Sequence, residues 1–266
     1  MTQDFMTQER VRPAAVAGLF YPAAPQALAQ LAGELLAQGA AEHPPARHLI
    51  APHAGWIYSG AVAAAAYGRI PAGIRRVLLL GPVHRVWTPG MALPSVASFV
   101  TPLGEIPLDC AALAALARLP GVAVDDRPHR DEHALEVHLP FLQLALGEFT
   151  LIPVLVGGAS AQAVAGLIAA CDDGRTLVLV SSDLSHFHDQ ATAQRLDAHT
   201  AQRILALATN LVGEEACGAA AINGLAHHAR DRGLTAELLD LRTSGDTAGP
   251  RDRVVGYGSF ALRAAA

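Results

Sequence analysis

Short, unbroken runs of apolar residues alternate along this chain with longer stretches in which apolar residues return every three or four positions. The runs are typical of strands buried on both faces of a sheet, and the longer stretches are typical of amphipathic helices. We therefore predict strands at Arg47–Pro52, Arg76–Leu80, Thr150–Leu155 and Thr176–Val180, and helices at Gln26–Gln38, Gly60–Arg69, Ser160–Cys171 and Ala191–Ala208.

Capping and turn residues predict the remaining elements. Ser59 and Ser160 stand where they can cap two of these helices, and Asp109 can cap a further helix at Ala111–Arg118. Pro140 must kink or divide a helix within Glu132–Leu146. The other predicted elements are a strand at Met91–Thr101 with a hairpin turn at Thr101–Gly104, a short strand at Val122–Val124, a helix from Glu214 or Ala216 to Arg230, and final strands at Glu237–Leu241 and Val254–Leu262.

The alternation of strands and helices predicts the α/β class. The hairpin and the two final strands indicate a mixed, mostly parallel central sheet flanked by helices. No linker rich in Pro or Ser divides the chain. We therefore expect a single domain over residues 1–266, with residues 1–12 as a flexible polar leader.

Composition excludes several classes of function. The net charge is −5, and the 19 basic residues are all Arg, so the sequence offers neither a Schiff-base lysine nor a P-loop lysine. No basic patch is indicated, so we do not expect nucleic acid as a partner. Hydrophobic residues make up 52% of the chain, as in a compact globular protein.

Three cysteines are too few and too scattered for a disulfide framework. The polar N-terminus has no apolar segment of the kind found in secretory signals, and no window approaches the roughly 20 apolar residues that a membrane-spanning helix needs. We therefore expect a cytoplasmic protein with reduced thiols and no membrane partner.

Histidines follow two of the predicted strands. His53 and His84 come just after the first and second of them, and Asp183 and His186 follow the strand at Thr176–Val180. Ligands of open α/β sheets bind beyond the carboxyl ends of the strands, so we expect these side chains to share one site. Imidazole is the commonest side-chain metal ligand and also transfers protons near neutral pH.

Each of these residues also has an ordinary structural explanation. His53 could be a surface-loop histidine, but the small residues after it favour a ligand pocket. Asp183 could ligate a metal, orient a histidine or cap a turn. His186 could act as a general acid or base, whereas His188 is typical of a solvated loop.

Two further residues are weaker candidates from spacing alone. His133 and His138 are five positions apart, so they point to different faces of a helix and at least one of them is structural. His133, at a potential helix start, is the better site candidate. Cys217 is either a small buried hydrophobe or, at a helix N-terminus, a thiolate ligand, and spacing favours the first.

Two other enzyme classes have less support. Ser182 or Ser185 beside Asp183 and His186 offers the residue types of a serine hydrolase, but Gly-x-Ser-x-Gly is absent and triad partners so close in sequence rarely meet. No Gly-x-Gly-x-x-Gly follows the first strand, so a dinucleotide is not indicated.

As a set, six blocks of sequence resemble the Memo family, which in prokaryotes is the B component of the AmmeMemoRadiSam system. The blocks run in order over nearly the whole chain, although each alone is weak. They are Ala17–Pro22, Ala51–Gly60, Leu80–His84, Glu132–Phe141, Ser181–His186 and Gly256–Gly258.

The resemblance implies a fold like that of the LigB-type extradiol dioxygenases, with metal ligands at His53, His84 and Cys217. It also implies that Asp183 and His186 lie beside the metal, with His186 in the place of the dioxygenase acid/base and His133 lining the same cleft. The dioxygenases complete their two histidines with a carboxylate, which suits iron(II). A thiolate here would also suit copper and could bind zinc, so the fold does not by itself imply dioxygenase activity.

The expected function is a redox protein dependent on Fe(II) or copper, with zinc as a further option, that acts on a small-molecule substrate. Animal relatives are associated with signalling, and some are described as binding phosphorylated peptides. A non-catalytic module that binds a peptide or protein is therefore the alternative, with Phe20 and Tyr58 contacting the peptide. Partner proteins of the AmmeMemoRadiSam system are also implied. A third hypothesis is metal-assisted hydrolysis near Asp183.

Overall fold

Four parallel strands form the centre of the main sheet in the computed structural model, which describes residues 11–39 and 44–264. They are β2 (His48–Ala51), β9 (Thr176–Ser181), β3 (Arg76–Pro82) and β8 (Thr150–Val156), in that spatial order. All four correspond to predicted apolar runs. Because the strands are parallel, their carboxyl ends lie along one edge of the sheet.

Antiparallel strands extend this sheet on both sides. β12 (Val254–Ala264) pairs with β2, and β11 (Leu234–Thr243) and β10 (His186–His188) pair with β12. On the other side β4 (Met91–Leu93) is antiparallel to β8, and β7 (Val122–Val124) is parallel to β4. The sheet is therefore mixed, and the predicted single-domain α/β fold is confirmed.

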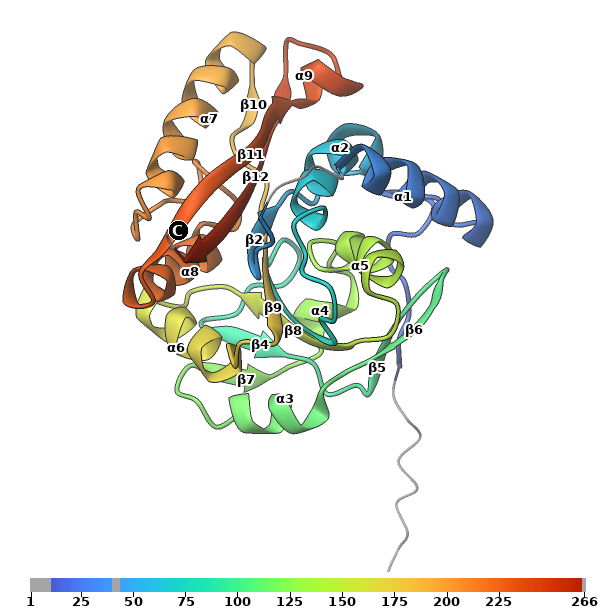
Figure 1. Cartoon of the computed structure of the whole chain (residues 1–266), viewed down its shortest axis with the longest axis vertical. Helices are drawn as coiled ribbons and strands as arrows, with labels where there is room; N and C mark the ends of the chain where they lie inside the picture. Colours follow the sequence, from blue (N-terminus) through green and yellow to red (C-terminus); the bar gives the residue numbers. More distant parts are fainter. Residues whose placement is uncertain (1–10, 40–43, 265–266) are drawn as a thin grey trace, which may run out of the picture.

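Helices cover both faces of the sheet (Figure 1). On one side lie α1 (Pro25–Gly39), α2 (Trp56–Tyr67) and α5 (Leu139–Leu146); on the other lie α6 (Ala161–Cys171), α7 (Gln190–Leu205) and α8 (Ala219–Asp231). The shorter helical segments are α3 (Cys110–Leu116), α4 (Arg127–Arg130), η1 (Glu136–His138) and α9 (Ser244–Thr247).

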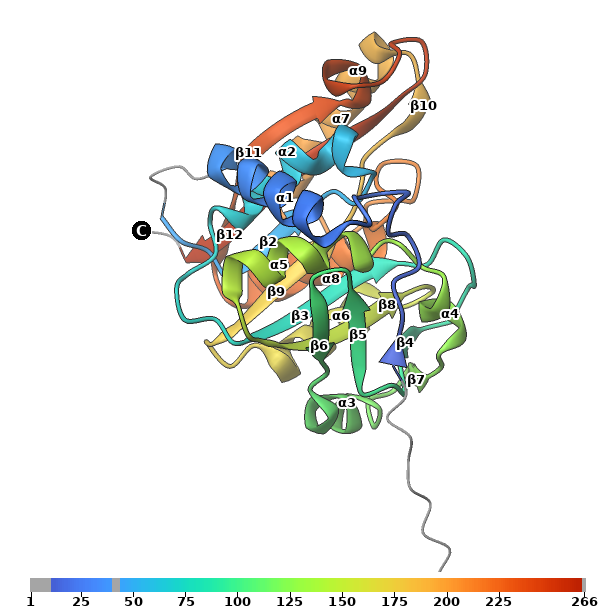
Figure 2. The ribbon, with the colours of Figure 1, turned by 90° about the vertical axis from the view of Figure 1, so that its right-hand side faces the viewer.

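A second, small sheet was not expected from the sequence (Figure 2). The predicted strand at Met91–Thr101 is two strands, and its second half, β5 (Ser98–Thr101), pairs with β6 (Gly104–Pro107) through the predicted hairpin turn. β1 (Val11–Arg12) pairs with β5 in parallel. The end of the expected leader is thus a strand, whereas residues 1–10 lie outside the described residues.

The predicted helix caps are right at two positions and wrong at one. Asp109 and Ser160 cap α3 and α6 by accepting hydrogen bonds from backbone N–H groups. Ser59 does not cap α2, because the helix begins three residues earlier, at Trp56, and the Ser59 hydroxyl donates instead to the Ala54 carbonyl at 2.9 Å. The helical stretch predicted within Glu132–Leu146 is divided beside Pro140, because η1 ends at His138 and α5 begins at Leu139 with the proline in its first turn.

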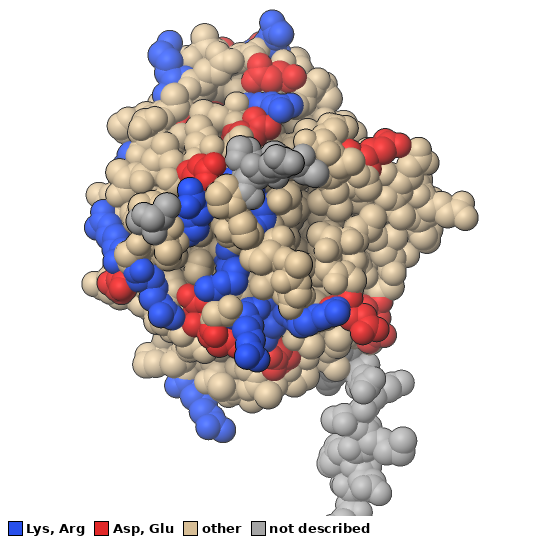
Figure 3. Space-filling view, in the orientation of Figure 1, with Lys and Arg blue, Asp and Glu red and all other residues tan. Residues whose placement is uncertain are grey.

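Arginine and carboxylate side chains are interspersed on the face of the molecule seen in Figure 3. Over this face no large area of one sign stands out, which agrees with the absence of a basic patch expected from the sequence. Among the described residues, no helix is long and apolar enough to cross a bilayer.

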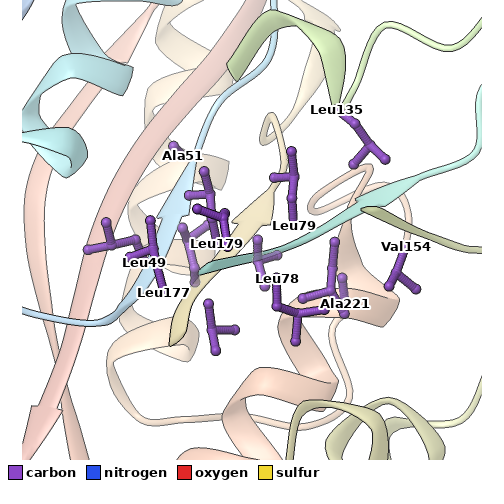
Figure 4. Packing of buried hydrophobic residues seen from close by; sticks show 14 of the residues in the cluster. Leu49, Ala51, Leu78, Leu79, Leu135, Val154, Leu177, Leu179 and Ala221 are labelled. Carbon is purple, nitrogen blue, oxygen red and sulfur yellow. The ribbon is translucent and has the colours of Figure 1, made fainter. Parts of the chain in front are cut away.

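The core lies where the parallel strands meet the helices (Figure 4). The labelled side chains of the three neighbouring strands β2, β3 and β9 belong to one buried hydrophobic cluster, and their exposed fractions are near zero. These residues are Leu49, Ala51, Leu78, Leu79, Leu177 and Leu179. Burial on both faces holds these strands rigidly, and so fixes the position of the polar residues that follow them.

Candidate metal centre

Three histidines converge at the carboxyl edge of the central strands. His53 follows β2, His84 follows β3, and His133 precedes η1. One ligand nitrogen from each ring lies within 4.8 Å of the other two. The His84 and His133 rings are stacked with their centroids 4.6 Å apart, and the His53 ring meets both edge-on at 5.1 and 5.4 Å.

The carboxylate of Glu132 lies beside the rings of His84 and His133. Its Oε1 accepts hydrogen bonds from Nδ1 of His84 at 2.8 Å and lies 3.2 Å from Nδ1 of His133. Its Oε2 accepts the backbone N–H of His84 at 2.6 Å. Burial alone would raise the pKa of this carboxyl, but the hydrogen bond and charge of His84 lower it to about 2. An ionised acceptor at Nδ1 of His84 places the proton there and leaves Nε2 of that ring as a free lone pair.

Burial keeps the rings of His53 and His133 uncharged. The pKa of His53, which is 1% exposed, falls well below its ordinary value because of burial and then because of the neighbouring His84. Burial likewise lowers the pKa of His133 to about 4. Neutral imidazoles are the form that binds metals, so this cluster presents its nitrogens ready for a cation.

Cys217 lies beside His53, just before α8. Its sulfur is 3.3 Å from Nε2 of His53 and 3.3 Å from the backbone nitrogen of Asp183. Gly218 allows this approach, because a Cβ there would lie 2.6 Å from the Ser181 carbonyl oxygen. Cys217 is outside the group of three whose ligand atoms all lie within 4.8 Å, so it adjoins the cluster on the His53 side.

Asp183 lines the same pocket. Its Oδ1 accepts the backbone N–H of His53 at 2.8 Å, and its Oδ2 lies 3.9 Å from Nε2 of His53. Burial raises the pKa of this carboxyl to about 7, against the opposing effect of the His53 N–H. The loop that carries it is anchored by Asp197 of α7, which accepts the backbone N–H of Ser185 at 2.9 Å.

Of the remaining predicted site residues, Phe20 and His186 adjoin the cluster. His186 begins β10, and burial lowers its pKa, with a further contribution from the charge of His84. The ring of Phe20 is tilted by 36° against that of His133, with the centroids 4.6 Å apart, and the Phe20 carbonyl accepts the N–H of Trp56 at the start of α2. Tyr58 is half-buried in the first turn of α2.

Sequence reasoning missed Glu132 and Ser181. The hydroxyl oxygen of Ser181 lies 2.6 Å from Nδ1 of His53 and 2.8 Å from Nε2 of His138. His138 is buried behind the site, whereas His133 faces it. Both missed residues adjoin predicted ones in sequence: Glu132 directly precedes His133, and Ser181 ends β9 shortly before Asp183.

A second group of potential ligands lies at the opposite end of β2. Oδ2 of Asp172 is 3.0 Å from Nε2 of both His48 and His228, and its Oδ1 accepts from Arg47 at 3.0 Å. Arg232 lies 3.7 Å from the same Oδ2. Two guanidinium groups beside one carboxylate oppose a further cation, so hydrogen bonding explains this cluster better than metal binding.

The fold and the site together define an α/β protein with a histidine cluster where parallel strands end. Residues 12–261 match the family described as Memo-like protein. This chain belongs to that family.

Two MEMO1 family proteins agree with this assignment over almost their whole length. A MEMO1 family protein of Archaeoglobus fulgidus is 33% identical over 264 residues, covering 93% of this chain and 98% of that protein. A MEMO1 family protein of Methanothermobacter thermautotrophicus is 33% identical over 274 residues, with 93% and 98% covered. A crystal structure of an uncharacterized Escherichia coli K12 protein aligns with a TM-score of 0.47 and 12% identity, covering 79% of this chain and 98% of that one.

Proposed function

We propose that this Memo-family protein binds a transition-metal ion and acts as an iron- or copper-dependent oxidoreductase. One observation carries the proposal: ligand nitrogens of His53, His84 and His133 lie within 4.8 Å of one another, in a pocket that keeps buried rings neutral. In this arrangement His133, which the sequence suggested as a cleft residue, is a third nitrogen ligand, and Cys217 is a neighbouring sulfur donor.

The donor set fits such an ion. Imidazole nitrogens suit iron, copper and zinc, and a cysteine sulfur favours copper, zinc and iron over magnesium or calcium. Nδ1 of His53 is engaged by Ser181 and Nδ1 of His84 by Glu132, so the Nε2 atoms of these two rings are the free donors. Carboxylate second-shell partners of this kind accompany metal-ligating histidines in many proteins.

The surrounding residues supply proton transfer and access. When bound, an iron or copper ion supplies one-electron redox chemistry. His186 takes or gives a proton, because its ring is only partly buried and lies near His84. Asp183 holds the backbone of His53 in place by accepting its N–H. The His84 side chain is 28% exposed, so a small hydroxylated aromatic substrate reaches the site from that side.

Metal titration tests the metal part of this proposal. Protein stripped with a chelator is titrated with Fe(II), copper or zinc, and bound metal is measured for wild type, His53→Ala and His84→Ala. We expect one ion per chain in the wild type and a loss of at least about 10-fold in affinity in both variants. His199→Ala, an exposed histidine of α7, is the matched control and should bind like the wild type. Equal metal content in wild type and His84→Ala would remove His84 from the site.

Oxygen uptake tests the redox part. Iron-loaded wild type should consume oxygen with catechol as a probe substrate, and His186→Ala should slow this while still binding the ion. Tight metal binding without any oxygen use, by the iron or copper form, would count against an oxidoreductase that uses oxygen.

A binding module is the second candidate, because exposed apolar side chains accompany the site residues in sequence. Ile57 is 67% exposed and Trp87 70% exposed, and each is within four positions of a site histidine. Leu19, Phe187 and Val212 are similarly exposed and lie within five positions of Phe20, His186 and Cys217. Peptide or protein binding that persists in the His53→Ala/Cys217→Ala double variant, and is lost in Trp87→Ala, would favour this function.

A further inference from the structure

The hydroxyl of Ser181 joins three groups behind the histidine cluster. Its oxygen lies 2.6 Å from the Ala134 carbonyl oxygen, 2.6 Å from Nδ1 of His53 and 2.8 Å from Nε2 of His138. Nδ1 of His138 is in turn 2.5 Å from the hydroxyl of Tyr67. All four side chains are at most 3% exposed, so water does not compete for these hydrogen bonds.

Only one placement of the hydrogen atoms satisfies all of these hydrogen bonds. A serine hydroxyl has one hydrogen to donate and two lone pairs that accept, whereas a carbonyl oxygen only accepts. The Ser181 hydrogen therefore points to Ala134, since otherwise two bare oxygens would face each other at 2.6 Å in a buried place. Both rings must then donate to Ser181: His53 carries its hydrogen on Nδ1 and His138 on Nε2.

The hydrogen bond between Tyr67 and His138 agrees with this assignment. With its hydrogen on Nε2, His138 has a bare Nδ1, which accepts the hydroxyl hydrogen of Tyr67. Burial raises the pKa of Tyr67 well above its ordinary value, so this phenol stays protonated and able to donate. Every donor in the sequence Tyr67, His138, His53 then has an acceptor, and Ser181 is saturated.

We propose that Ser181 is a positioning residue that holds His53 with its hydrogen on Nδ1 and so presents Nε2 toward Cys217 and the metal site. Glu132 does the same for His84 with a charged carboxylate. His53 thus has an uncharged partner and His84 an anionic one. The consequence for metal affinity rests on the proposed function, whereas the tautomer is a property of the metal-free protein.

Nuclear magnetic resonance of ¹⁵N-histidine-labelled, metal-free protein at neutral pH tests the tautomer directly. Long-range ¹H–¹⁵N correlations should show hydrogen on Nδ1 of His53 and on Nε2 of His138. In Ser181→Ala the His53 ring should shift toward the other tautomer or a mixture, and Ser181→Thr, which keeps a hydroxyl, should restore the wild-type pattern. Ser98→Ala, which removes a buried hydroxyl without a hydrogen-bond partner, should leave it unchanged. Hydrogen on Nε2 of His53 in the wild type would overturn the proposal, whether or not the variants fold.

Zinc affinity, measured by competition with a chelating dye, separates this inference from the proposed function. We expect Ser181→Ala to weaken zinc binding by about 10- to 100-fold and Ser181→Thr by much less. Equal zinc affinity in wild type and Ser181→Ala would refute the positioning role. If the wild type shows the expected tautomers but binds no metal, the proposed function fails while the assignment of the hydrogen to Nδ1 of His53 by Ser181 is supported.

Discussion

The sulfur of Cys217 and Nε2 of His53 lie 3.3 Å apart, although 164 positions separate the two residues in the sequence. The loop before α8 and the end of β2 bring them together, with Gly218 and Asp183 between the two segments. Nitrogen and sulfur at this separation can share one ion, and this leads to the first prediction.

Zinc should protect Cys217 from alkylation. In metal-free protein, iodoacetamide should label exposed Cys110 fastest. Partly buried Cys217 should react slowly, because burial raises its pKa to about 12, so labelling is followed for long enough to detect it, and fully buried Cys171 should react least. Addition of zinc should reduce labelling of Cys217 while Cys110 is labelled as before. Mass spectrometry of peptides measures all three sites in one sample. Unchanged labelling of Cys217 at saturating zinc would show that its sulfur is not a ligand.

Glu132→Gln should weaken metal binding by about 10- to 100-fold, because an amide has one acceptor oxygen and cannot accept from both Nδ1 and the backbone N–H of His84. Calorimetric titration with zinc measures the effect. Glu105→Gln, on the exposed edge of β6, is the control and should bind like the wild type. A Glu132→Gln variant with wild-type affinity would mean that the rings are held by packing alone.

Gly218→Ala should destabilise the protein and disturb the Cys217 side of the site. The new Cβ would lie 2.6 Å from the Ser181 carbonyl oxygen and 2.7 Å from Cβ of Ser182, so backbone must move. Gly166→Ala in α6 is the matched control, since its Cβ would meet nothing within 4 Å. That control should gain up to about 1 kcal/mol of unfolding free energy, because alanine favours a helix over glycine. Urea unfolding measures both changes, and a Gly218→Ala variant as stable as the control would contradict the close packing.

Glu136→Ala should cost about 3–5 kcal/mol of unfolding free energy, because it leaves the buried guanidinium of Arg12 without its partner. The carboxylate also accepts from the hydroxyl of Tyr21 at 2.6 Å and from two backbone N–H groups. The Arg12→Ala/Glu136→Ala double variant should lose less than the sum of the single losses, because no charge remains unpaired. Additive losses would show that the two side chains act independently.

Protonation of Asp172 should lower the free energy of unfolding in acid. Hydrogen bonds from His228 and then His48 hold the pKa of this carboxyl below its ordinary value in the folded protein. In the unfolded chain the carboxyl takes up a proton near pH ~4, so its contribution is present above that pH and is lost as the pH falls further. The stability difference between wild type and Asp172→Asn should therefore shrink when urea unfolding is moved from about pH 6 to about pH 3. The exposed Asp252→Asn should show no such trend.

The apolar pattern predicts the central strands and most helices because these elements bury whole runs of side chains. The pattern does not reveal strands that form through backbone pairing with a neighbouring strand rather than through burial of an apolar run. β1 is two residues long and contains Arg12, so no periodicity reveals it, and β5 is separated from β4 only by a short irregular stretch. The start of α2 was misplaced because Gly55, not Ser59, precedes its first turn.

The site was predictable to the extent that parallel strands end together. This reasoning places His53 and His84 at one edge, and the structure brings their rings to 5.1 Å. Which third residue joins them depends on the path of the loop before η1, and no local pattern determines that path. Glu132 and Ser181 act through hydrogen bonds across 48 and 128 positions of sequence, which spacing cannot reveal. Ligation by Cys217 stays a prediction.

The donors of the proposed centre are scattered from residue 53 to residue 217, so an unfolded chain holds no preformed site for the ion. A cation that recognises only the native arrangement draws the folding equilibrium toward it, and a ligand concentration 100 times its dissociation constant adds about 2.7 kcal/mol. The melting temperature of this protein should then depend on the metal supplied during growth and purification, and a chelator would act as a mild denaturant.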